Sequence, residues 1–156
     1  DATNCRYWKA SNPDTQWRWV FYDLDLSMNQ ASTNSLQRLL APDSLRFSKD
    51  IRLLYAWLLR NPDYKQRFLE RASFLYQEVF SPPMANKGID LFVDLYEPEI
   101  AQELERWKHR RDWTRSVEIL RRFFDTRPEY LRTFFRDHYR LSHSELDRLF
   151  PPSEDL

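Results

Sequence analysis

The chain contains a single glycine, Gly88, among its 156 residues. Glycine is the residue that most readily adopts the positive φ values of tight hairpin turns, and all-β sandwiches and barrels need many such turns. A sequence this poor in glycine therefore disfavours those folds and favours helices. Hydrophobic residues make up 42% of the chain and aromatic residues 16%, so we expect an ordered domain with a packed core rather than a disordered segment.

The β signal is confined to residues 1–28. A short strand is expected around Cys5–Lys9, and turn-forming residues occupy Ser11–Gln16. Large side chains then alternate along Trp17–Tyr22 with the period of two that is typical of a strand. The two segments predict an antiparallel hairpin with an acidic exit.

The remainder of the chain predicts helices joined by short breaks. We expect a loop with one helical turn over residues 29–48, a helical subdomain over residues 49–150 and a frayed tail over residues 151–156. Apolar residues in the long segment recur at steps of three and four, the spacing of amphipathic helices. Polar and Pro-containing segments mark the expected helix starts at Ser48, Asn61, Ser81, Asp112, Thr126 and Ser142. The expected fold class is mainly α with an N-terminal β-hairpin.

Three further expectations concern these helices. The apolar face that begins at Tyr64 is expected to continue in register to Val79. Pro98 lies inside an apolar pattern, so a kink or restart is expected near Glu97. The aromatic stripes have helical spacing, and we expect them to form the core.

Composition excludes several classes of function. Twenty-four basic residues balance 24 acidic ones, and a chain without net charge is not a general nucleic-acid binder. We interpret the basic segment Lys108–Ser116 as a solvated junction between helices. The alternative interpretation is a local patch that binds nucleic acid. No apolar run approaches the roughly 20 residues that span a bilayer, so no membrane span is expected.

Cysteine and histidine give no site of their own. Cys5 is the single cysteine and cannot form an intrachain disulfide, and the histidines have no metal-ligand spacing. The sequence begins at Asp1 without an initiator methionine, so we expect a piece of a longer protein. The compartment is therefore unknown from the sequence.

Oxygen-bearing side chains flank the predicted hairpin. Asn4 precedes its first strand and Asp23 follows its second, so the antiparallel pairing would make them neighbours. With Asp25 they offer the hard oxygen ligands that Mg²⁺ or Mn²⁺ prefers, and an Asn and an Asp also hold the metal ions in protein kinases. The alternative is a plain hairpin end, where Arg6 or Arg18 pairs with the acid.

Several segments, taken in order, resemble the CotH family, the spore-coat-protein-H kinases. The N-terminal part contains "DATNCRYWK" followed by "NPDTQWRWVFYDLDLSM". The helical part contains "LLRNPDYKQRFLERASFLYQEVFSP", "YEPEIAQELERW" and "TRPEYLRTFFRDHY". The resemblance covers roughly residues 1–140 and depends on the order and spacing of these segments.

The resemblance implies the C-terminal part of an atypical protein-kinase-like fold. Such a kinase uses ATP and Mg²⁺ or Mn²⁺ to phosphorylate protein substrates, here coat or secreted proteins at the spore coat, the cell surface or outside the cell. By position, Asp23 would be the metal-binding and cofactor-binding Asp, and Asn4 the corresponding Asn of the catalytic loop. Asp25 would be a supporting metal-site acid.

The sequence departs from the family pattern at three points. Asp1 lies three positions before Asn4, whereas the kinase loop places its base about five before. Either Asp1 is the catalytic base of a shortened loop, or the base lies upstream. Leu26–Asn29 stands where the family often has glycines and aromatic residues.

The third departure is that nothing resembles the phosphate-covering loop or the ATP-pairing Lys. We therefore expect an isolated chain without kinase activity that depends on an N-terminal portion of the same protein. The alternative function is a non-catalytic helical interaction module, or a degenerate kinase relative of the coat or cell surface.

Overall fold

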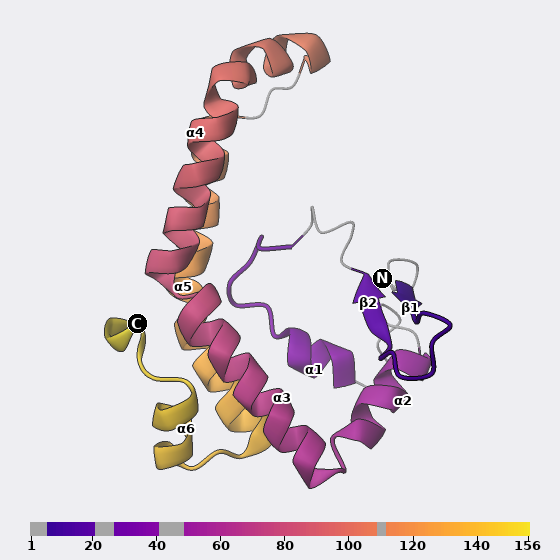
Figure 1. The fold of residues 1–156 in the computed structure, drawn as a ribbon. Coiled ribbons are helices and arrows are strands. Elements are labelled where there is room, and N and C mark those ends of the chain that lie inside the picture. The colour runs from indigo at the N-terminus through magenta and orange to yellow at the C-terminus, as the bar shows by residue number, and fades with distance from the viewer. Residues whose placement is uncertain (1–5, 21–26, 41–48, 109–111) are drawn as a thin grey trace.

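The computed structural model describes residues 6–20, 27–40, 49–108 and 112–156. Over these ranges the chain is mainly helical, with a two-stranded antiparallel hairpin at its N-terminal end, as predicted (Figure 1). No helix among these residues combines the length and the apolarity needed to cross a bilayer.

The hairpin consists of β1 (Arg6–Trp8) and β2 (Arg18–Val20). The register pairs Arg6 with Val20, and the side chain of Asn12 accepts a hydrogen bond from a backbone N–H in the turn at 3.1 Å. Tyr7 makes edge-on contacts with two tryptophans, with ring centroids 5.4 and 5.5 Å apart. Both strands are exposed along their length, so these aromatic side chains are not core residues in this chain.

Three helices follow the hairpin: α1 (Ser35–Leu40), α2 (Lys49–Leu58) and α3 (Pro62–Phe74). α1 lies inside the segment that was expected to be a loop with a helical turn. α3 begins as predicted, because Asn61 caps it by accepting hydrogen bonds from two backbone N–H groups of the first turn at 2.9 and 3.3 Å. Pro62 occupies the first turn, where its missing N–H has no consequence.

A π-helical turn, η2 (Leu75–Val79), extends α3 and changes its buried face. The N–H of Phe80 donates to the carbonyl of Leu75 at 2.8 Å, a bond that spans one residue more than an α-helical bond. The extra residue rotates Tyr76 into the core, where it is 4% exposed, and leaves Val79 39% exposed. The prediction that Val79 continues the apolar face was therefore wrong.

The longest helical pair is α4 (Pro82–Trp107) and α5 (Trp113–Tyr139), which lie side by side in Figure 1. α4 continues through Pro98 without a restart, and Figure 1 shows it bending in its C-terminal part, as expected of a kink. Ala85 and Ile89 face α5 and are buried. Phe92, which was expected in the core, is 61% exposed.

α5 continues through Pro128, so the predicted restart at Thr126 was wrong. Asp112 caps its beginning, as predicted. Proline in a helix interior loses one backbone hydrogen bond, which local rules treat as a break. Here Phe124, Pro128 and Phe135 are buried on one continuous stripe. Packing on both sides of the proline therefore offsets the lost bond.

The C-terminal part closes the larger core. α6 (His143–Leu149) begins with the predicted capping box at Ser142, and η3 (Ser153–Asp155) follows it. The tail is not frayed: Ser153 Oγ donates to Glu129 at 2.8 Å. The larger buried cluster consists of Leu69, Tyr76, Phe135, Tyr139, Leu146, Leu149 and Phe150.

Candidate functional site

The predicted site residues all lie outside the described ranges: Asp1, Asn4, Asp23 and Asp25. Arg6 and Val20, the described residues closest to them on each strand, are paired with each other in the hairpin. Within the described residues, no group of three or more His, Cys, Asp or Glu side chains could hold a metal ion. The metal site therefore stays a prediction.

The segment that follows the acidic pair in sequence, residues 27–35, is bound to α5 by Arg127. Its guanidinium Nη1 donates to the carbonyls of Ala31 and Thr33, the latter at 2.8 Å. The segment is also bonded to itself, because the N–H of Thr33 donates to the carbonyl of Gln30 at 3.1 Å. The hydrogen bond from Arg127 to Ala31 joins residues 96 positions apart in sequence and holds this segment against α5.

The guanidinium of Arg127 is half-buried and lies near two aromatic rings. It lies 5.8 Å from the ring centroid of Phe123 and 5.4 Å from that of Phe134, within cation–π range. Burial lowers the pKa of Arg127 because desolvation penalises the charged form. No carboxylate of the described residues lies within ion-pair distance of this cation.

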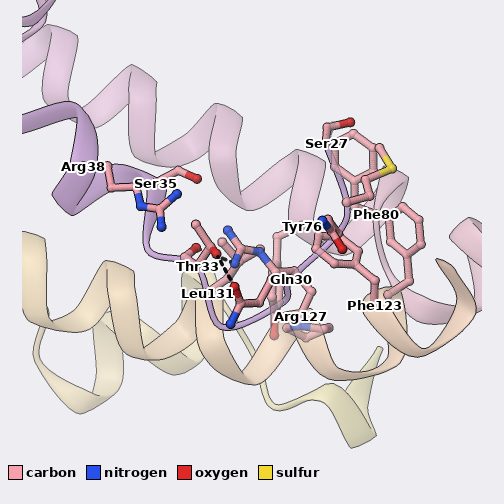
Figure 2. A pocket seen from close by; sticks show the side chains of 14 residues that line it. Ser27, Gln30, Thr33, Ser35, Arg38, Tyr76, Phe80, Phe123, Arg127 and Leu131 are labelled. Carbon is pink, nitrogen blue, oxygen red and sulfur yellow. Dashed lines mark hydrogen bonds between the residues drawn. The ribbon is translucent and has the colours of Figure 1, made fainter. Parts of the chain in front are cut away.

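A pocket of about 640 Å³ opens beside Arg127. In Figure 2 the side chains of the 27–35 segment and the guanidinium groups of Arg38 and Arg127 gather along it, with Tyr76 from η2 and Phe80 from the junction between η2 and α4. None of the described residues that line the pocket is acidic. Its polar lining consists of Ser27, Asn29, Gln30, Thr33, Ser35, Arg38 and Arg127. Hydroxyl and amide donors beside two cations can bind an anion.

Sequence reasoning missed this pocket. The predicted helix start at Thr126 placed Arg127 in a first turn, although α5 is continuous there. A usable signal was present: Arg127 comes four positions after Phe123 and seven before Phe134, so a cation sits on an aromatic helix stripe. Its partners Ala31 and Thr33 are too distant in sequence for that signal to identify them.

Comparison with known proteins identifies the family. The model of the family described as CotH kinase protein matches residues 1–131, a range that includes the hairpin, the 27–35 segment and the pocket. No curated protein and no solved structure matched the chain. The match covers most of the sequence and agrees with the resemblance of the quoted segments. The chain therefore belongs to the CotH kinase protein family.

Proposed function

We propose that this protein acts in ATP- and divalent-metal-dependent phosphoryl transfer to protein substrates. The observation that supports this most is the family match over residues 1–131, which includes every candidate site residue. Asn4 and Asp23 would ligate Mg²⁺ or Mn²⁺, and Asp25 would assist as a nearby acid. The proposed substrates are coat or secreted proteins, and the proposed fold is the C-terminal part of an atypical kinase.

The hairpin register sets a condition on the proposed ligand pair. Arg6 pairs with Val20, and an antiparallel ladder advances one residue on each strand in opposite directions. Continuing this register by two positions would pair Asn4 with Tyr22, the residue before Asp23. Side chains alternate between the two faces along a strand, so a regular ladder would direct Asn4 and Asp23 to opposite faces. Joint coordination of one ion by both side chains therefore requires the regular second strand to end before Asp23.

Catalysis would consist of positioning and charge stabilisation. The metal, when bound, would neutralise charge on the ATP phosphates. Asp23 and Asn4 would fix its position through their side-chain oxygens. An aspartate, either Asp1 or one upstream, would orient the acceptor hydroxyl and take its proton. In this proposal an upstream portion of the same protein supplies the loop over the phosphates and the pairing Lys.

Manganese binding tests the ligand assignment. We expect Mn²⁺ titrated in the presence of ATP, followed by electron paramagnetic resonance, to bind the protein with its upstream portion. Asp23→Asn and Asn4→Ala should each weaken binding at least about tenfold, because each removes a metal-ligand oxygen. Asp14→Asn makes the same chemical change in the exposed turn of the same hairpin and should have no effect.

ATP turnover tests the reaction itself. In the protein with its upstream portion, Asp23→Asn should abolish turnover, and Asp14→Asn should leave it unchanged. Turnover that survives Asp23→Asn, or metal binding that falls equally in both variants, would refute the assignment of Asp23. The isolated 156-residue chain is expected to be inactive in the same assay.

An exposed apolar surface favours the second candidate, a non-catalytic interaction module. Three side chains within about one turn of α4 are largely exposed: Leu91 at 65%, Phe92 at 61% and Leu95 at 64%. Contiguous apolar surface of this kind is typical of helices that pack against a partner. Absence of metal-dependent ATP binding in the protein with its upstream portion would favour this function over the kinase.

A further inference from the structure

Among the residues that the structure describes, those that line the pocket beside the 27–35 segment carry positive charge without a matching acid. Arg127 is half-buried, and the described residues that line the pocket with it include Arg38 but no Asp or Glu. A desolvated cation is unfavourable unless an anion or several acceptors compensate it. Two backbone carbonyls supply part of that compensation through Nη1. The remaining charge makes this pocket attractive to an anion.

The bonds of Arg127 leave one edge of the guanidinium available. Both N–H groups of Nη1 are directed to the carbonyls of Ala31 and Thr33. Within the described ranges, Nε and Nη2 have no hydrogen-bond partner. These two nitrogens form the fork that binds two oxygens of a carboxylate or a phosphate. Because the two carbonyl bonds and the nearby rings of Phe123 and Phe134 hold the guanidinium in place, the fork is oriented before a ligand arrives.

The rest of the lining suits a phosphate better than a planar carboxylate. A tetrahedral dianion can accept hydrogen bonds on several sides, and the hydroxyl of Ser35 and the amide of Asn29 lie around the same pocket. Arg38, exposed in the last turn of α1, adds a second cation. The volume of about 640 Å³ leaves space for the larger molecule to which the phosphate is attached.

We infer that this pocket binds a phosphate group, of a nucleotide or of a phosphorylated side chain, through the Nε–Nη2 edge of Arg127 and the guanidinium of Arg38. The inference uses neither Asn4 nor Asp23 and involves no metal ion. It therefore stands independently of the proposed kinase chemistry, and a failure of one leaves the other unaffected.

Titration of the 156-residue chain with inorganic phosphate tests this site. Binding is measured by calorimetry and by the shift in melting temperature, with EDTA present to exclude metal-dependent binding and with NaCl at matched ionic strength as the reference. We expect saturable binding of phosphate. Arg38→Gln should weaken it about fivefold or more, because one charge-assisted hydrogen bond is lost.

Two further variants separate a specific site from general charge. Arg122→Gln removes an exposed cation of the same helix as Arg127 and should leave phosphate binding unchanged. Arg127→Lys keeps the charge but loses the fork and should weaken binding more than Arg38→Gln does. Circular dichroism checks that Arg127→Lys folds. If Arg127→Lys does not fold, Arg38→Gln still tests the site, because this substitution breaks no described hydrogen bond.

The ligand source is decided by two parallel titrations. Tighter binding of ADP than of phosphate indicates a nucleotide, and tighter binding of O-phosphoserine indicates a phosphorylated side chain. The inference is overturned if phosphate gives no response beyond that of NaCl. It is equally overturned if Arg122→Gln weakens binding as much as Arg38→Gln.

Discussion

Tyr76 shows how a single side chain joins distant parts of the fold. It projects from the π-helical turn η2, is 4% exposed, and its hydroxyl donates to the carbonyl of Pro151 at 2.7 Å. Its ring contacts Phe150 edge-on, with centroids 5.4 Å apart. Burial, assisted by the charge of Glu129, raises the pKa of Tyr76 to about 12. The native state therefore requires this phenol to be neutral.

This pKa predicts a loss of stability in alkali. A tyrosine in water has a pKa of about 10, so between about pH 10 and 12 the unfolded chain loses this proton while the native state keeps it. Stability due to Tyr76 is thus complete below about pH 10 and falls as pH rises, by at most about 1.4 kcal/mol per pH unit. Urea unfolding of wild type and Tyr76→Phe, at intervals from about pH 8 to 12, measures this loss of unfolding free energy.

Subtracting the unfolding free energy of Tyr76→Phe from that of the wild type at each pH cancels the titration of lysines and other tyrosines. Near pH 8 the wild type should be more stable by about 1 kcal/mol, because Tyr76→Phe removes the hydrogen bond to Pro151. That advantage should shrink and then reverse above about pH 10. A difference that stays constant with pH would contradict the raised pKa.

Single residues also mark the limit of prediction from sequence. Asn61 and Ser142 were predicted as caps because a cap bonds to N–H groups within three positions. Arg127 was missed because the carbonyls to which it donates hydrogen bonds lie more than 90 positions away in sequence. Asn4 and Asp23 were named from chemistry and resemblance, and they stay predictions because they lie outside the described residues.

At the scale of elements, prolines and the π-helical turn show where local rules fail. Helix propensity predicts a break at Pro128, yet α5 continues through it because buried residues both before and after the proline pack on one stripe. Periodicity predicts a straight apolar face to Val79, yet η2 inserts one residue and rotates the face. In each case tertiary packing decides whether the helix continues and which face is buried, and local sequence patterns do not show that packing.

Gly88 gives a prediction for α4. It lies in the helix interior without positive φ, and a Cβ added there would have no heavy atom within 4 Å. Glycine in a helix interior is less favourable than alanine by about 0.5–1 kcal/mol. Gly88→Ala should therefore raise the free energy of unfolding by about that amount, measured by urea denaturation.

The matched control is the reverse change on the same helix. Ala101 is exposed in α4, so Ala101→Gly should lower the free energy of unfolding by a similar amount. If Gly88→Ala destabilises the chain, then something occupies the space beside Gly88 in solution, and the exposed face of α4 is covered.

At the scale of the whole molecule, much aromatic surface is uncovered. Sequence patterns predicted the helical fold and the hairpin, because periodicity shows that a segment has an apolar face. Periodicity does not show what covers that face, so the aromatic stripes were wrongly expected to be core throughout. Five tryptophans are 49–64% exposed: Trp8, Trp17, Trp19, Trp57 and Trp107.

This exposure predicts an unusual fluorescence signature for the folded chain. Indole emission shifts to the red when water surrounds the ring, and Trp113 is the most shielded of the six tryptophans, the other five being about half exposed or more. The emission maximum of the native chain should lie close to that of the urea-unfolded chain, while circular dichroism shows full helicity. Acrylamide should quench most of the emission. A strongly blue-shifted native spectrum that persists on dilution would show that the hairpin and α2 pack against other parts of the same chain. A blue shift that disappears on dilution would show that a second copy covers them.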